Sequence, residues 1–258
     1  MAKTNRANAV FAALLLLVAT DAWCYRPFVG TDADVARLHD LEVETGLIGL
    51  SRDSGHNVYT IPNPLVLNYG LVRHVEVVGQ FAVIAPDGQA SQLSDPELAV
   101  KVVLKEGELQ DQPGVSVALE SSLLFSSTLP EENRIGFEEA FMFSRKLLGL
   151  TFHLNLGGGV ERSASLPFAA YGLITEFPLS KRLRFVDEIN GESINTRTPD
   201  TSDLAGFLWE PYWNDVVIDA AYRRGLSAVS QTWSVQAGIS IAFSLGKKGE
   251  VVPPENAH

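Results

Sequence analysis

The sequence has almost no cysteine and no long hydrophobic run beyond its first residues. Cys24 is the only cysteine among 258 residues, so an internal disulfide is excluded and we interpret this thiol as incidental. After residue 22, no run approaches the roughly 18 apolar residues that a membrane-spanning helix needs. If the mature chain enters a membrane, it must do so as a closed β-barrel, because only neighbouring strands can then satisfy its backbone polar groups.

Positive charge is also scarce. The chain has 20 Lys and Arg against 31 Asp and Glu, a net charge of −11. Removal of residues 1–22 would take away Lys3, Arg6 and Asp21 and leave 18 basic and 30 acidic residues, or −12. Such an acidic balance disfavours nucleic acid and anionic membrane surfaces as partners.

The sequence has no pattern that predicts a cofactor or a metal site. Cysteine and histidine do not occur together at the spacing of metal ligands. The glycine run 157–159 precedes loop residues rather than a helix, so it is not a phosphate-binding loop. We therefore expect no cofactor and no bound metal.

The first residues have the composition of a secretion signal. Lys3 and Arg6 precede the apolar run 10–19, and Thr20 and Ala22 supply the small residues of a cleavage site. The apolar run is too short to cross a bilayer as a helix. We expect residues 1–22 to be a cleaved signal peptide, so the mature protein is exported.

Alternation of apolar and small polar residues is clearest near the C-terminal end. Every second residue from Trp233 to Phe243 is apolar, whereas the residues between them are Ser, Gln, Gly, Ser and Ala. A strand with this sequence has one face for lipid and one for a wet interior. Trp233 and Phe243 are ten residues apart, about one tilted crossing, which places an aromatic residue at each membrane interface. This segment is expected to close a membrane barrel.

The same alternation recurs along the chain, with turn residues between the segments. In residues 150–157, for example, Phe152 and Leu154 oppose Thr151 and His153. About twelve such segments occur, and single-chain outer-membrane barrels use an even number of strands. The expected strands are 41–50, 59–69, 75–83, 97–105, 115–125, 135–144, 150–157, 168–177, 182–189, 204–209, 216–222 and 233–243.

These segments predict an all-β fold, namely a closed antiparallel up-and-down transmembrane β-barrel of about 12 strands over residues 41–243. Residues 23–40 are expected to be an extended periplasmic segment, and residues 244–258 a polar periplasmic tail. Connections on the side of both termini are mostly compact, and those on the other side are longer, as outer-membrane barrels require. The longer ones are expected at 87–96, 126–134, 158–165 and 190–202.

A soluble lipocalin-like or sandwich protein would show the same alternation with its apolar face turned inward. Three observations favour the membrane barrel: the number of strands, the small residues on the polar face, and aromatic residues near strand ends.

Several short segments give the mature chain a resemblance to a known family. They are 26–34, 42–46, 67–71, 154–157, 219–226 and 233–239. Their order and spacing are similar to those of the outer-membrane proteins grouped as the MetA-pathway of phenol degradation or transporter family. The resemblance implies a small outer-membrane channel in a Gram-negative bacterium, with aromatic or hydrophobic molecules among its permeants. Members of that family tend to end close to their terminal aromatic residue, whereas here residues 244–258 follow Phe243.

The alternation also predicts which polar side chains line the lumen. In a channel, rings of such charges set selectivity, whereas in a narrow barrel they can form an ion-pair network that fills the interior. Both interpretations stay open for each residue, and we do not predict whether the lumen is open or plugged. The candidates are Glu42, Glu44, Glu76, Lys101, Lys105, Glu120, His153, Asn155, Glu176, Asp219 and Arg223.

Three functions fit the sequence: a channel or transporter for small molecules, a non-conducting structural or assembly-related barrel, and an outer-membrane hydrolase. A lipid-face hydrolase would need a Ser/His pair and a third orienting group on the outer surface. The alternation instead places His153 in the lumen, so we predict no catalytic residue. The expected partners are outer-membrane lipid, a small-molecule permeant and the barrel assembly machinery.

Overall fold

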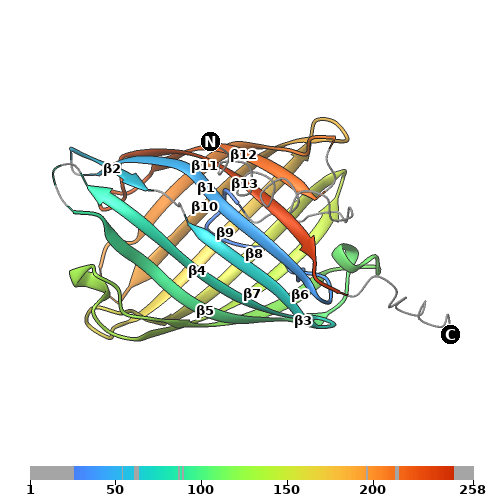
Figure 1. Cartoon of the computed structure of the whole chain (residues 1–258), viewed down its shortest axis with the longest axis horizontal. Coiled ribbons are helices and arrows are strands. Elements are labelled where there is room, and N and C mark those ends of the chain that lie inside the picture. Colours follow the sequence, from blue (N-terminus) through green and yellow to red (C-terminus); the bar gives the residue numbers. More distant parts are fainter. Residues whose placement is uncertain are drawn as a thin grey trace, which may run out of the picture.

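The chain folds as a closed β-barrel in which every strand is antiparallel to its neighbours (Figure 1). The computed structural model describes residues 26–53, 55–60, 64–86, 88, 90–195, 197–212 and 215–246. The predicted signal peptide, Cys24 and most of the predicted C-terminal tail lie outside these residues.

The strands follow one another around the barrel in chain order. β2 (His56–Thr60) and β3 (Leu65–Val72) both lie between β1 and β4, so they share one strand position and the barrel has twelve positions. The other strands are β1 (Asp40–Asp53), β4 (Val75–Pro86), β5 (Gln92–Lys105), β6 (Ser116–Leu124), β7 (Gly136–Leu147), β8 (Leu150–Val160), β9 (Pro167–Pro178), β10 (Leu183–Ile194), β11 (Asp200–Trp209), β12 (Val216–Gly225) and β13 (Trp233–Ser244).

The last strand closes the barrel, as its sequence predicted. β13 pairs with β1 from Asp40↔Ser244 to Arg52↔Trp233, so no strand edge is left open along this seam. The prediction of a closed antiparallel barrel of about 12 strands is therefore confirmed.

Burial is the reverse of that in a soluble protein. Glu44, Glu76 and Lys101 are almost completely buried, whereas Phe141 and Phe207 are more than 40% exposed. Because side chains alternate along a strand, the buried charges face inward and the exposed apolar residues face outward. This pattern suits a barrel with lipid outside, and it argues against the soluble alternative.

The two ends of the barrel differ. At the turn end, where β1 begins and β13 ends, β3 joins β4 and β7 joins β8 through two residues each. The connection between β5 and β6 at this end carries the short 3-10 helix η2 (Glu108–Gln110). The opposite end, called the loop end, carries the longer β6–β7 connection with η3 (Pro130–Glu132).

Several loop-end connections are shorter than predicted, because the strands continue into polar sequence. Asn190 pairs with Ser202, and Glu192 pairs with Asp200, within a segment that was expected to be a loop. The outward residues of this part of β10 are Gly191 and Ser193, which have no large apolar side chain. The alternation of apolar and polar residues that predicted the centre of the strand is therefore absent here.

No helix among the described residues is long and apolar enough to cross a membrane.

Candidate functional site

A stretch of the chain lies inside the barrel. Residues 26–38, which we call the inner segment, precede β1. They make hydrogen bonds to inward-facing side chains of eight different strands, β1, β4, β5, β7, β8, β10, β12 and β13. The prediction that residues 23–40 form an extended periplasmic segment is wrong for this part of it. The physical reason is that the barrel wall supplies hydrogen-bond acceptors for its backbone N–H groups.

The N-terminal end of the inner segment is held by two acidic side chains. Arg26 Nε lies 3.2 Å from Asp219 Oδ2 on β12, and both side chains are buried. The backbone N–H of Arg26 donates to Glu44 Oε2 at 3.1 Å, while Asn68 Nδ2 donates to the other Glu44 oxygen at 2.8 Å. A Cβ atom at Gly238 would lie 2.3 Å from Arg26 Nε, so this glycine leaves the space that the guanidinium occupies.

A third acidic side chain holds the next residues of the segment. Glu188 on β10 accepts hydrogen bonds from the backbone N–H groups of Val29, at 3.1 Å, and Gly30, at 2.8 Å. Its charge is balanced by Arg223 on β12, whose Nη2 donates to Glu188 Oε2 at 2.9 Å. Arg223 also donates to Asn190. Arg223 and Glu188 therefore join neighbouring strands of the wall to one another and to the inner segment.

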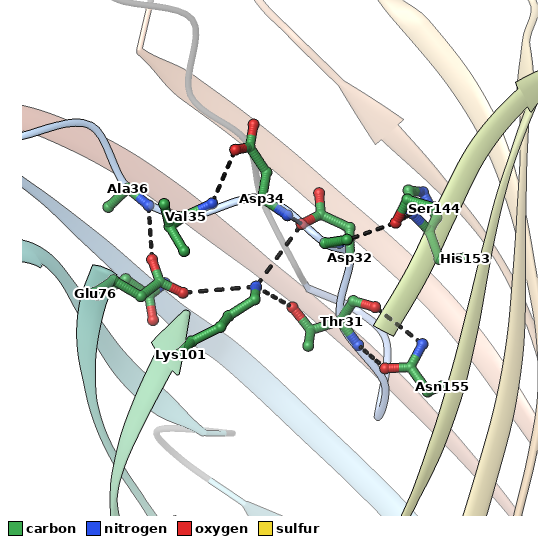
Figure 2. Close-up of polar contacts among 12 residues, drawn as sticks. Thr31, Asp32, Asp34, Val35, Ala36, Glu76, Lys101, Ser144, His153 and Asn155 are labelled. Atoms are coloured by element: carbon green, nitrogen blue, oxygen red, sulfur yellow. Dashed lines mark hydrogen bonds and ion pairs between the residues drawn. The ribbon is translucent and has the colours of Figure 1, made fainter. Parts of the chain in front are cut away.

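Thr31 sits between opposite sides of the interior (Figure 2). Its backbone N–H donates to Asn155 Oδ1 at 3.0 Å, and Asn155 Nδ2 donates back to its carbonyl at 2.9 Å. Its hydroxyl accepts from Lys101 Nζ at 3.1 Å. Lys101 also lies 3.5 Å from Glu76 and 3.8 Å from Asp32, and it is only 1% exposed.

Ser144, His153 and Glu176 form a chain of polar contacts on β7, β8 and β9. Ser144 Oγ lies 2.8 Å from His153 Nδ1, and His153 Nε2 lies 3.4 Å from Glu176 Oε1. Ser144 has no exposed surface, and its hydroxyl accepts a hydrogen bond from the backbone N–H of Ala33 at 2.9 Å. A nucleophilic serine must reach a substrate, so this geometry supports positioning of the inner segment rather than hydrolysis.

Apolar contacts also hold the inner segment against the barrel wall. Phe28 packs against Val186, Leu208 and Val217 of the barrel wall. Ala33 packs in a second cluster with neighbours from η2, β6 and β7, namely Leu109, Ala118 and Met142.

The structure buries most of the predicted lumen residues at the level of the inner segment. Those with less than a tenth of their surface exposed are Glu42, Glu44, Glu76, Lys101, His153, Asn155, Glu176, Asp219 and Arg223. Glu120 faces inward, opposite Lys101 in the β5–β6 register, but it is only half-buried.

Lys105 was predicted to share a face with Lys101, and this is wrong. The β5–β6 register shifts between Val103 and Lys105, which pairs Lys105 with Val117 on the outward face. A bulge of this kind reverses the side-chain alternation, and Lys105 is exposed as a result.

Sequence reasoning missed Arg26, Ser144 and Glu188. Glu188 could have been found, because it continues the inward alternation of Val186 on β10. Arg26 could not, since it lies in a segment without strand periodicity and its partner Asp219 is 193 residues away.

On the side of β5, β6 and β7, the loop half of the interior is less filled. Glu97 and Glu138 face inward but are half-buried, like Glu120. Gln80 Nε2 donates to Glu97 Oε2 at 2.5 Å, and within the described chain neither of these two side chains forms a hydrogen bond with the inner segment. Solvent therefore reaches acidic side chains in this half, whereas the wall around the inner segment is covered.

Metal binding finds no support in the described part of the chain, where no group of three or more His, Cys, Asp or Glu side chains is arranged to hold an ion.

Solved structures with a similar fold are outer-membrane channels. The NanC porin matches with a TM-score of 0.58 and 10% identity, over 78% of this chain and 98% of that one. An outer-membrane channel from Pseudomonas putida F1 matches with a TM-score of 0.60 and 11% identity, over 84% and 100%. The sequence matches no protein-family model and no curated protein. The chain thus has the closed β-barrel fold of these outer-membrane channels.

Proposed function

We propose that the protein is an outer-membrane channel through which small molecules pass, with the inner segment as its narrowest part. The observation that carries this proposal is the contrast between the two halves of the interior. Inward-facing Glu97 and Glu138, nearer the loop end, remain accessible to solvent, whereas Lys101 and Glu188 beside the inner segment are covered. A path that is wet on one side and constricted on the other is the arrangement of a selective pore.

Charge in the wet half supports a preference among permeants. Glu97 and Glu138 both face inward there, and Glu138 lies within electrostatic range of Glu97. Acidic linings favour cations and neutral molecules over anions. We therefore propose that inorganic anions pass least readily.

Apolar surface inside the barrel supports a hydrophobic or aromatic permeant, as the family resemblance implied. Phe28 packs against the buried wall residues Val186, Leu208 and Val217 and remains partly exposed, so its ring offers apolar surface at the constriction. A molecule with one aromatic ring could slide past such a surface without a large cost of dehydration. Export through a signal peptide at residues 1–22 and folding by the barrel assembly machinery belong to the same proposal.

Passage can be tested with purified protein in planar bilayers and in liposomes, using a panel of aromatic acids and neutral hydrophobic solutes. The proposal expects small single-channel currents, cation preference in a salt gradient, and more swelling with the neutral hydrophobic solutes than with the aromatic acids, which are anions at neutral pH. A folded barrel that passes neither ions nor any solute would support the non-conducting alternative, for which the buried network of Arg26, Asp219, Glu188 and Arg223 would be structural filling.

A further inference from the structure

Two arginines and a tryptophan form a row on the outer surface at the loop end. β12, β13 and β1 lie side by side at the seam that closes the barrel (Figure 1). Trp233 on β13 is the register partner of both Arg224 on β12 and Arg52 on β1. Register partners share a face, and the neighbouring pair Arg223↔Ser234 points inward. Arg52, Trp233 and Arg224, which we call the rim row, therefore point outward.

Both guanidinium groups of the rim row are available to a partner. Arg52 and Arg224 are exposed, and within the described chain neither forms an ion pair. Arg52 donates one hydrogen bond, to Asn57 Oδ1 at 3.4 Å. Asp203 is the register partner of Arg224 on β11 but does not pair with it. Although the chain as a whole is acidic, this part of its surface is locally suited to an anion.

Other arginines at the loop end are neutralised by carboxylates. Arg162 contacts both Asp95 and Glu132, and Arg197 Nη1 lies 3.9 Å from Glu161 Oε2. Those ion pairs join the loop-end connections to one another. The rim row differs from them because its two charges have no such structural partner.

The outward residues beneath the rim row are aromatic and apolar. One outward position nearer the middle of the strands, Tyr222 pairs with Val235, Val235 with Leu50, and Leu50 with Tyr59 on β2. Tyr222, Val235 and Tyr59 are exposed, as is Ile48 one further outward position along β1. Cations, then aromatic rings, then aliphatic side chains follow the order of phosphate, interface and acyl chain in a lipid leaflet. A lipid uses all three layers, whereas a soluble anion would use only the cations.

The spacing of the two arginines suits a headgroup with more than one phosphate. One strand separates β12 from β1, so the α-carbons of Arg52 and Arg224 lie about 10 Å apart. Each guanidinium can bind phosphate oxygens through two parallel hydrogen bonds. Two phosphates held apart on a sugar scaffold fit this arrangement better than the single phosphodiester of a phospholipid does.

We propose that the rim row binds a phosphorylated glycolipid of the outer leaflet. Arg52 and Arg224 hold its phosphates, and its acyl chains lie over Tyr222, Val235 and Leu50. The inference rests on an outer-membrane location with the loop end outside, and it does not depend on what the barrel conducts. The bound lipid bridges β12, β13 and β1, the strands at which the barrel closes.

Binding of fluorescently labelled, diphosphorylated lipid A to purified protein in detergent tests the site. Arg52→Gln/Arg224→Gln should raise the dissociation constant about tenfold or more, since both charge-assisted contacts are lost. Asp203→Asn should leave it unchanged or lower it, because a carboxylate beside the anion is removed. The matched control is Arg145→Gln, which changes an exposed outward arginine at the turn end of β7 and should bind like wild type. Heat-modifiable migration confirms that each variant is folded. Equal dissociation constants of the double variant and wild type would overturn the proposal.

Competition identifies the source of the anion. Unlabelled diphosphorylated lipid A should displace the label at a far lower concentration than phosphatidylglycerol, dephosphorylated lipid A or inorganic phosphate. Equal displacement by phosphatidylglycerol or by inorganic phosphate would overturn the proposal, because the row would then be a general anion site. Orientation has its own measurement on intact cells. An epitope tag between Ile194 and Asp200 that faces the periplasm would place the row in the phospholipid leaflet and would also overturn it.

Discussion

The guanidinium of Arg26 and the carboxylate of Asp219 form a buried ion pair, with Nε and Oδ2 separated by 3.2 Å, between the start of the inner segment and the wall of the barrel. This contact joins residues that are 193 positions apart in the sequence. Asp219 and Arg223 share the inner face of β12, but they bind different partners, because Arg223 pairs with Glu188.

Asp219→Asn should loosen this end of the inner segment. The substitution keeps the volume but removes the carboxylate that pairs with the buried Arg26, and breaking a buried ion pair costs about 3–5 kcal/mol when the groups cannot move. Release of the segment end avoids that cost, so we expect larger or more frequent openings in single-channel records and a shift of the reversal potential toward anions. Asp203→Asn, the same change on the outer face, serves as the control. If Asp219→Asn has the same conductance and reversal potential as wild type, the Arg26–Asp219 pair does not line the permeation path.

Lys101→Met should weaken the fold, whereas Lys105→Met should leave it unchanged. Lys101 is buried against Thr31, Asp32 and Glu76, so its loss leaves carboxylates without a cation, at a cost of about 3–5 kcal/mol. Lys105 lies four residues further along β5 but faces outward after the bulge. Urea-induced unfolding of the two variants in detergent or lipid measures the difference. Similar midpoints would show that the ion cluster around Lys101 does not stabilise the barrel.

The lipid-facing assignment predicts a dependence on depth. Leu154 is outward and central in β8, so Leu154→Arg should destabilise the folded barrel by about 2–4 kcal/mol. Leu147, also exposed, ends β7 at the turn end, and Leu147→Arg should cost about 0–1 kcal/mol. Reversible unfolding in lipid vesicles provides both values. Equal losses would argue against the position of the membrane along the strands.

Orientation can be tested on intact cells. If both termini are periplasmic, an epitope tag in the loop-end connection between Ile194 and Asp200 should bind antibody from outside. A tag after His258 should bind antibody only after the outer membrane is permeabilised. Outside labelling of the C-terminal tag alone would reverse the orientation.

The alternation of apolar and polar residues identified the barrel because the two faces of each strand have different surroundings, lipid outside and polar side chains inside. The closing strand from Trp233 shows this most clearly, and nine of the eleven predicted lumen residues are buried in the structure. The alternation gave a wrong or no prediction at two places where a strand departs from it. The bulge before Lys105 reverses the faces, and the loop-end pairs of Asn190 and Glu192 have no apolar outer neighbours.

The inner segment was beyond prediction from sequence for a different reason. Its contacts are mostly made by backbone N–H groups, which every residue carries, as at Val29, Gly30 and Ala36. Their acceptors, Glu188 and Glu76, lie on strands that only the closed barrel brings together. A local sequence pattern cannot predict this site, because the inner segment and its acceptors on the strands meet only when the whole barrel has closed.

The most direct test of the proposed channel compares wild-type protein with a variant that lacks residues 26–38, keeping the signal region and β1. Single-channel conductance in planar bilayers is the measurement, after heat-modifiable migration has confirmed that the deletion variant folds. We expect the variant to conduct several-fold more current than wild type, since the contacts of the inner segment span the interior from Asp219 to Lys101. Equal conductance of the two proteins would place the permeation path elsewhere, and absence of current from both would contradict the channel itself.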